Sequence, residues 1–298
     1  MFSRRHPYLF FLLIFSSILA AASVVISLLI FWGTRHADFE FGEKVGIIEI
    51  KGYISEVTPI LRSFKRFRED DSIKAIVVRI DSPGGGVGPS QEIYREIKKT
   101  IEMKKVVASL GTIATSGGYY IAAAANGIVS SPGTVTGSIG VIMGFANIQE
   151  LLKKIGLFPV VIKSGAYKDT GSPHRKMTGK ERELLQDFVD KIHRQFIAAV
   201  SKGRNIDPAK VEMIADGRIF SGESAQELGL VDRLGNFHDA IEWAGKMGGI
   251  KGKIATVFAE KKKFSIWRYI VDSSFKTILN RAIEPTFYGG YLYVPTGS

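Results

Sequence analysis

The stretch Ala-Ile-Val-Val-Arg-Ile at residues 75–80, followed directly by Asp-Ser-Pro-Gly-Gly-Gly at 81–86, decides the fold. Five of the first six residues are apolar and four are β-branched, which is typical of a strand buried on both faces. The three glycines leave backbone N–H groups that a ligand can approach closely. A P-loop is disfavoured, because Val87-Gly88-Pro89 stand where it needs Gly-Lys-Ser/Thr. The segment predicts a strand ending in a functional loop, with a plain tight turn as the alternative.

Strand-like and helix-like segments alternate on both sides of this stretch. Strands are expected at 45–50, 106–110 and 159–163, and helices at 90–103, 119–126 and 148–155. The pair Thr178-x-x-Glu181 forms a capping box that opens a long helix. One face of that helix is apolar, with Leu185, Phe188, Val189, Ile192, Phe196 and Val200. Shorter helices are expected after Asp207-Pro208 and from Ser221 to Leu228. This alternation predicts an α/β domain with a largely parallel sheet.

The composition excludes several classes of protein. The 298 residues are 45% hydrophobic and 23% charged, so the chain is neither disordered nor collagen-like. It contains no cysteine, which excludes a disulfide scaffold, thiolate metal sites and a cysteine nucleophile. The net charge of +11 is compatible with nucleic acid, with an anionic membrane surface or with no specific partner.

The amino-terminal segment favours the membrane. The run from Leu9 to Trp32 is apolar over 24 residues, and a helix needs roughly 20 to cross a bilayer. The residues Arg4, Arg5 and His6 precede it, which predicts an N-terminus in the cytoplasm and the remaining chain outside. A signal peptide cleaved near Ala20–Ala22 is the alternative, but the run exceeds the usual h-region of about 7–15 residues. We expect an uncleaved anchor holding a basic domain beside anionic lipid.

The chain therefore divides into four expected parts. They are the cytoplasmic N-terminus and anchor (1–34), a linker (35–43), the α/β domain (44–248) and a C-terminal extension (249–298). The extension carries Lys261–Lys263 and an aromatic tail with Phe287, Tyr288, Tyr291 and Tyr293. We expect a peripheral docking role for it, with the membrane surface as one candidate contact. Packing on a neighbouring subunit or on the protein's own cleft, and a disordered end, are alternatives.

A candidate nucleophile lies in Ala-Thr-Ser-Gly-Gly-Tyr-Tyr at 114–120. Ser116 stands at a strand-to-helix junction, where the N–H of Gly117 has no partner within the helix. Acyl transfer needs such a pair, because the nucleophile must lie beside a donor for the oxyanion. The segment departs from the Gly-x-Ser-x-Gly elbow at Ala114. An ordinary helix N-cap is the alternative role for this serine.

A candidate base lies in Lys-Ser-Gly-Ala-Tyr-Lys-Asp at 163–169. Among the five histidines only His174 falls in a plausible loop, and no orienting acid is evident for it. A lysine can act as a base once burial lowers its pKa from about 10.4 toward neutrality. Lys168 follows Ala166 and Tyr167, which can exclude water from it. A solvated surface lysine is the alternative.

Five segments occur in an order that resembles the signal peptide peptidase A (protease IV) family, over roughly residues 43–246. They are 81–86, 114–120, Thr-Gly-Ser-Ile-Gly-Val at 136–141, 163–169 and Ala-Asp-Gly-Arg-Ile-Phe-Ser-Gly at 215–222. The resemblance implies a crotonase/Clp-protease-like α/β fold and a serine endopeptidase with a Ser–Lys dyad. It implies Ser116 as nucleophile, Lys168 as general base, and Gly85 and Gly117 as oxyanion donors. Thr115 departs from the family, which commonly has alanine there.

The resemblance also implies substrates, assembly and location. Members degrade signal peptides after their release, and other membrane-associated peptides are possible substrates. Short members form ring-like homo-oligomers in which the serine and the lysine come from adjacent subunits. The implied location is the inner (cytoplasmic) membrane, with the catalytic domain periplasmic, and neither a metal nor a nucleotide cofactor is implied. The alternatives are a crotonase-like enzyme acting on coenzyme A thioesters, an inert membrane scaffold, and a Ser–His–Asp hydrolase using His174.

Overall fold

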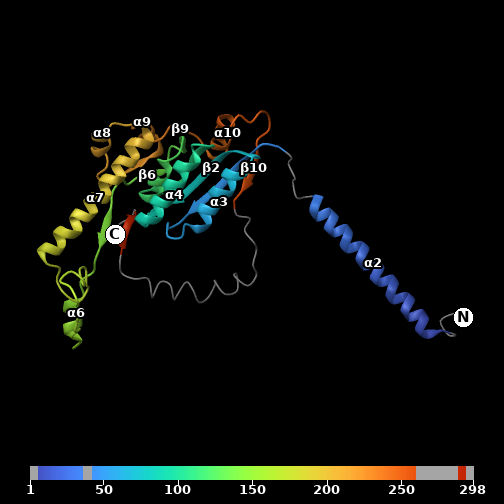
Figure 1. Cartoon of the computed structure of the whole chain (residues 1–298), viewed down its shortest axis with the longest axis horizontal. Helices are drawn as coiled ribbons and strands as arrows, with labels where there is room; N and C mark the ends of the chain where they lie inside the picture. Colours follow the sequence, from blue (N-terminus) through green and yellow to red (C-terminus); the bar gives the residue numbers. More distant parts are fainter. Residues whose placement is uncertain (1–5, 36–41, 260–287, 293–298) are drawn as a thin grey trace. The chain divides into compact units, whose positions relative to one another are not determined.

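The computed structural model describes residues 6–35, 42–259 and 288–292, with side chains for 6–28 and 42–259. The chain forms two units, which divide after Gly42. The first contains helix α2 (Pro7–Arg35), drawn in blue in Figure 1. Its segment Pro7–Leu28 has a mean hydropathy of 2.7 and is long enough to cross a membrane. The expected apolar helix is thus present, and its orientation in a membrane stays a prediction.

The second unit is built on a parallel sheet, as expected. Its strands follow the order β10-β1-β2-β4-β5-β9, and each neighbouring pair is parallel. The bounds are β1 (Lys44–Lys51), β2 (Ile73–Ser82), β4 (Lys105–Thr115), β5 (Gly127–Ser130), β9 (Arg233–Leu234) and β10 (Ala255–Phe258). Strand β6 (Val135–Gly137) pairs with the far end of β4, and β8 (Ile219–Ser221) runs antiparallel beside β6. The sheet therefore continues past residue 248, where the sequence placed the end of the domain.

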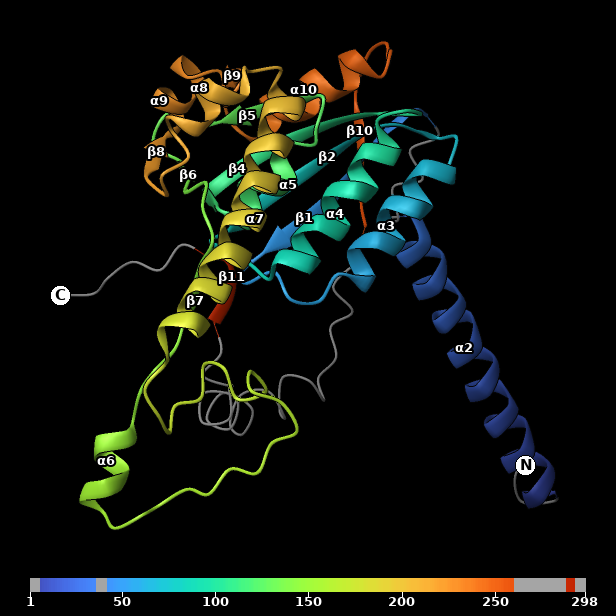
Figure 2. The same cartoon turned by 60° about the vertical axis from the view of Figure 1, so that its left-hand side comes forward.

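Helices cover both faces of this sheet. One face carries α3 (Thr58–Glu69), α4 (Val87–Thr100), α5 (Gly117–Ala122) and part of α7 (Gly179–Arg204), and the other carries α10 (Phe237–Met247) (Figure 2). The side chains of strand β2 contribute to the hydrophobic clusters on both faces of the sheet. Ile76, Val78 and Ile80 join the first cluster, while Ala75 and Val77 join the second. The period-two alternation of a strand thus explains why nearly every residue of this segment is apolar. Two short helices, α8 (Pro208–Glu212) and α9 (Gly222–Glu227), complete the unit.

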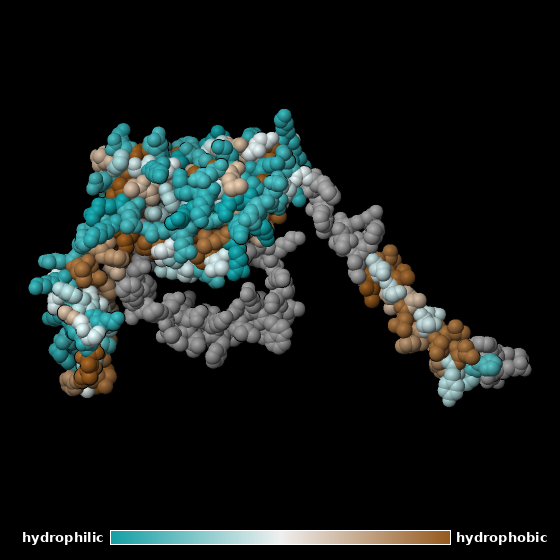
Figure 3. All heavy atoms as spheres, in the orientation of Figure 1, coloured by the Kyte–Doolittle hydropathy of each residue, from teal (hydrophilic) through white to brown (hydrophobic). Residues whose placement is uncertain are grey.

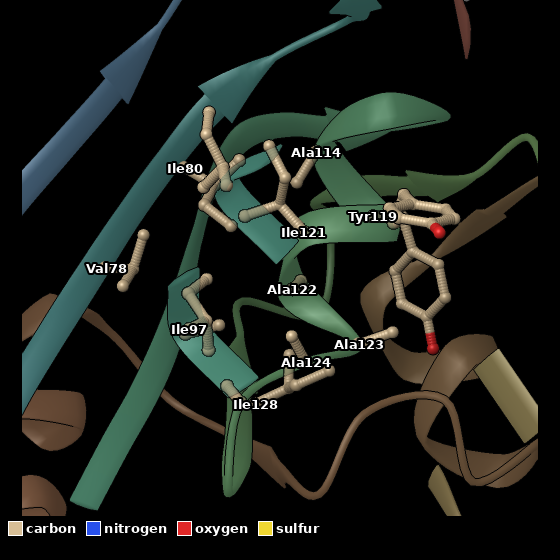
Figure 4. Close-up of a cluster of buried hydrophobic side chains, with 14 of the residues drawn as sticks. Val78, Ile80, Ile97, Ala114, Tyr119, Ile121, Ala122, Ala123, Ala124 and Ile128 are labelled. Carbon is tan, nitrogen blue, oxygen red and sulfur yellow. The ribbon is translucent and has the colours of Figure 1, made fainter. Parts of the chain in front are cut away.

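Helix α5 lies wholly inside the protein. All six of its residues are buried, and Figure 4 shows the side chains of Ile121 and Ala122 among those of Ile80 and Ile97. The hydroxyl of Tyr119 donates a hydrogen bond of 2.9 Å to the carbonyl of Leu230. Burial of this small helix fixes the residue that precedes it. The helix begins at Gly117 and ends at Ala122, earlier than the expected 119–126.

Residues 142–178, here called the arm, project from the sheet between β6 and α7 (Figures 1 and 2). The arm contains β7 (Ile142–Gly144) and α6 (Gln149–Lys154). The strand expected at 159–163 is wrong, because this segment lies exposed and pairs with no strand in the described part of the chain. Figure 3 shows hydrophobic residues at the end of the arm. The exposed apolar side chains of the arm include Leu151, Ile155, Leu157, Phe158, Val160, Val161 and Ile162.

The burial of helix α7 changes along its length. Its capping box is formed as predicted, with Thr178 accepting from the Glu181 N–H. Ile192, Phe196 and Val200 are buried, but Phe188 on the same predicted face is half exposed. The first turns of α7 extend beyond the sheet and join the arm, where Leu185 and Val189 of the same face are only partly buried.

A second, smaller sheet contains the end of the described chain. Strand β11 (Tyr288–Leu292) lies between β3 (Gly84–Gly85) and β7. This part of the extension, expected to be peripheral, therefore packs on the loops of its own domain. The lysines at 261–263, Phe287 and Tyr293 lie outside the described residues.

Candidate active site

Ser116 occupies a strained turn between β4 and α5. Its backbone has φ 54° and ψ −118°, a conformation that residues other than glycine rarely adopt. The surroundings hold it there: its N–H donates to the Gly137 carbonyl (2.8 Å), and its carbonyl accepts from the Tyr120 N–H (2.8 Å). A serine nucleophile on a sharp strand-to-helix turn has this arrangement, although Ala114 departs from the usual motif.

The Ser116 hydroxyl is not used as a helix cap. The side chain makes no capping hydrogen bond to an N–H of α5. An ordinary N-cap serine would accept from the first turn of the helix. The structure thus excludes the capping alternative and leaves a strained serine, 1% exposed, with a hydroxyl that caps no helix.

The glycine loop after β2 lies beside this turn. Ser82 pairs with Ala114 in the parallel register of β2 and β4, so both strands leave the sheet side by side. Gly85 packs against Ile54 so closely that an added Cβ would lie 2.3 Å from the Ile54 carbonyl oxygen. Only glycine fits there. The register thus brings together the loops that carry three candidate residues, Ser116, Gly117 and Gly85.

The direction of the Gly85 N–H follows from its neighbours. Ile54 donates its N–H to the Gly84 carbonyl (2.9 Å), and Gly86 donates its N–H to the Ile54 carbonyl (2.9 Å). These bonds use the groups that face Ile54. Because successive groups along an extended backbone alternate in direction, the Gly85 N–H points to the opposite side. The Gly85 N–H therefore points to the side on which β11 pairs with β3, which is where a substrate carbonyl would have to lie to reach it.

Two side chains that the motif reasoning did not assign hold the glycine loop in place. The Ser82 hydroxyl accepts from the Gly84 N–H (3.0 Å). The Thr115 hydroxyl donates to the Pro83 carbonyl (3.1 Å), and Thr115 is fully buried. Thr115 therefore joins the turn of the serine to the loop of Gly85. The presence of threonine at position 115, where the family commonly has alanine, was the only feature of the sequence that pointed to this role.

Within this chain Lys168 does not join the site. It lies exposed in a turn of the arm, where its N–H donates to the Gly165 carbonyl (3.2 Å). The amine that pairs with Asp169 belongs to the neighbouring Lys163. His174, the alternative base, is also exposed on the arm. One copy of the chain thus presents the serine and the oxyanion loop together, and the candidate base separately.

Charged contacts hold the turn of Lys168 against α7. The carboxylate of Asp169 accepts from Arg175 (2.8 Å) and from Lys163 (2.6 Å). Arg175 also binds Glu181, which closes the capping box of α7. These hydrogen bonds, first of all those from Arg175, hold the pKa values of Asp169 and Glu181 well below their usual range. These contacts therefore fix the position of the turn that carries Lys168.

Comparison with known proteins decides the family. Residues 98–251 match the model of Peptidase family S49, and residues 51–134 match that of Clp protease. The slr0021 protein of Synechocystis sp., named as a protease, is 47% identical over 210 residues, which are 70% of this chain and 76% of that protein. The chain belongs to peptidase family S49. It has a Clp-protease-like α/β fold, as the sequence predicted, and its family and the names of its relatives support a serine protease.

Two further relatives are longer proteins, of which this chain covers about a third. The chloroplastic serine protease SPPA of Arabidopsis thaliana is 35% identical over 222 residues, covering 70% of this chain and 33% of that protein. Protease 4 of Salmonella typhi is 36% identical over 185 residues, covering 62% and 30%. A mutant of the membrane-bound stomatin-specific protease 1510-N shares the fold, with a TM-score of 0.50 at 16% identity over 74% of this chain and 99% of that one.

Proposed function

We propose that this S49 peptidase is a membrane-anchored serine endopeptidase that cleaves signal peptides and other apolar peptides near the membrane. Ser116 is the nucleophile, Lys168 the general base, and the N–H groups of Gly85 and Gly117 are the oxyanion donors. The observation that carries the proposal is the strained Ser116 turn, with a hydroxyl that caps no helix, braced beside the Gly85 loop.

The reaction follows from these groups. The neutral amine of Lys168 takes the proton of the Ser116 hydroxyl as the oxygen attacks a peptide carbonyl. The two glycine N–H groups bind the resulting oxyanion, and losing one such donor typically costs about 100–1,000-fold in rate. The carbon–nitrogen bond then breaks and lysine returns the proton to the leaving amine. Water hydrolyses the acyl ester and restores the serine.

A second copy of the chain supplies the lysine. Ser116 is buried in the body of one copy, whereas Lys168 is exposed on the arm. The arm also exposes a run of apolar side chains over 157–162, which a neighbouring copy covers in a ring-like homo-oligomer. This contact buries the amine, and burial is what disfavours its charged form. The braced turn of Asp169 and Arg175 keeps the amine at a fixed place on the arm.

The anchor sets the location. Helix α2 spans the inner membrane with the basic N-terminus in the cytoplasm and the protease unit in the periplasm. A site tethered there meets apolar peptides that leave the bilayer. This location disfavours an enzyme that acts on coenzyme A thioesters. The strained Ser116, whose hydroxyl caps no helix, disfavours an inert scaffold. Nucleic acid and a cofactor have no part in the mechanism.

Covalent labelling tests the proposal. The full chain in detergent is treated with a serine-reactive phosphonate, and mass spectrometry locates the adduct. We expect the adduct on Ser116, no labelling of Ser116→Ala, and no hydrolysis of a signal peptide by that variant. Lys168→Arg is the matched control for the base, because it keeps the positive charge but cannot release its proton. An adduct on another residue, or full activity of either variant, would refute the assignment.

A further inference from the structure

The strands on the two edges of β4 place different groups on the two sides of Ser116. On one edge the end of β2 pairs with β4, and the loop of Gly85 follows β2. On the other edge β6 pairs with residues 113–115, and Ser138 follows β6. A serine nucleophile lies between the carbonyl that it attacks and the base that takes its proton. Since the oxyanion loop lies on the β2 side, the base is expected from the β6 side.

A cavity of about 450 Å³ lies on this β6 side. Its walls come from the segment 138–142, from helix α7 and from the loop 215–217 before β8. The first of these walls adjoins the serine, because the Gly137 carbonyl accepts the Ser116 N–H (2.8 Å) and Ser138 is the next residue. The lining therefore starts one residue after the group that holds the backbone of the nucleophile.

The lining of this cavity carries negative charge and one unsatisfied polar atom. Among the described residues that line it, the side chains charged at neutral pH are Asp190 of α7 and Asp216. Hydrogen bonds from Arg218 lower the pKa of Asp216 to about 2, which keeps its carboxylate ionised. His193 also lines the cavity, and its buried Nε2 has no hydrogen-bond partner within the described residues. Buried polar atoms almost always have a partner in native proteins, so this wall is incomplete in one copy.

The arm carries the opposite charge. Between residues 142 and 178 it has six basic and two acidic side chains. Residues 163–168 of the arm are exposed, including Lys168 and the ring of Tyr167. A basic turn and an acidic cavity attract each other, and such complementarity fixes the register of two surfaces. A turn that brings Lys168 to Ser116 from the β6 side passes over this cavity.

We infer that the cavity, here called the socket, receives residues 163–168 of a second copy, whose backbone and basic side chains pair with Asp190, Asp216 and His193. The inference rests on the proposed function, because it names the surface through which the dyad assembles. The two carboxylates touch no reacting atom. They are positioning residues, which hold the neighbour's turn so that its amine reaches the serine.

Cross-linking between copies tests the socket without using activity. The chain has no cysteine, so an introduced pair is the only one present. Two full-length Ser116→Ala chains with different tags are co-expressed, one with Gln186→Cys in the socket and the other with Ala166→Cys in the arm. We expect a short bis-maleimide to link the two tags. Glu242→Cys on α10 replaces Gln186→Cys in the control, which should give no product. A missing socket product, or equal linking in the control, would overturn the inference.

Charge reversal tests whether the carboxylates carry the contact. Asp190→Lys places like charges opposite each other, so we expect at least about tenfold slower peptide hydrolysis in dilute protein, relieved as the protein concentration rises. Asp187→Lys makes the same change on α7 outside the cavity lining and should match the wild type. Equal rates for Asp190→Lys and Asp187→Lys, or a loss that concentration does not relieve, would contradict the inference.

The two proposals fail separately. If the phosphonate labels Ser116 but the socket pair does not cross-link, the socket is wrong and the protease assignment stands. If the pair cross-links but no serine is labelled, the socket is supported and the proposed mechanism fails.

Discussion

The separation of Ser116 from Lys168 in one copy leads to a complementation experiment. Ser116→Ala and Lys168→Ala are each inactive by the proposed mechanism, since a general base contributes about 100- to 10,000-fold and the nucleophile is required. If the dyad crosses between copies, a Lys168→Ala subunit supplies the serine and a Ser116→Ala neighbour supplies the lysine. Mixing the two then restores complete sites.

The expected recovery follows from the geometry. In a ring with head-to-tail contacts each site takes its serine from one copy and its lysine from the next, so equal random mixing completes about one quarter of the sites. Activity should therefore rise to about 25% of the wild type, from at most about 1% for either variant alone. The arm supports this arrangement. It extends away from the sheet (Figure 2), and its Lys168 and several of its apolar side chains are exposed.

The assay is hydrolysis of a quenched apolar peptide by co-expressed, differently tagged chains purified through both tags. Double purification ensures that every measured oligomer contains both variants. Ser116→Ala mixed with the Ser116→Ala, Lys168→Ala double variant is the control and should stay inactive. If the productive pair stays inactive although both chains purify together, the dyad does not cross between copies and the reasoning is refuted.

Three further perturbations address the site itself. Thr115→Val removes the hydrogen bond to the Pro83 carbonyl, which is worth roughly 1 kcal/mol. We expect kcat to fall about fivefold at constant KM, and Thr115→Ser to restore it. An unchanged kcat in Thr115→Val would show that Thr115 does not position the glycine loop. Gly85→Ala should lower kcat about 100-fold or more because its Cβ meets the Ile54 backbone, whereas Gly133→Ala, with open space around it, should match the wild type in the same assay. Arg175→Gln should lower the thermal midpoint at neutral pH. The lowered pKa of Glu181 makes its contribution present above the ordinary value of 4.5 and lost as the pH falls, so the two midpoints should converge in acid, and a constant gap would contradict this.

Much of the fold was predictable because it depends on local patterns. The apolar run of β2 predicted a buried strand, and the structure shows Ile76 and Val77 buried in opposite layers. The capping box of Thr178 and Glu181 marked the start of α7 correctly, because both partners lie within one helical turn. The segment 159–163 failed, because its apolar residues predict a strand while no neighbouring strand in the described chain pairs with it. Apolar composition predicts that a segment is buried, but it does not indicate which other part of the protein covers that segment.

The sequence by itself determined the α/β class, the membrane-length helix and the motifs that named Ser116, Gly85 and Lys168 as candidates. Only the tertiary structure decided how they meet. The pairing of Ser82 with Ala114 sets the glycine loop beside the serine, packing around α5 holds Ser116 at φ 54°, and β11 pairs with strands more than 140 residues earlier in the chain. Such contacts join residues far apart in sequence, and their register depends on the packing of the whole sheet, which no local pattern of residues encodes.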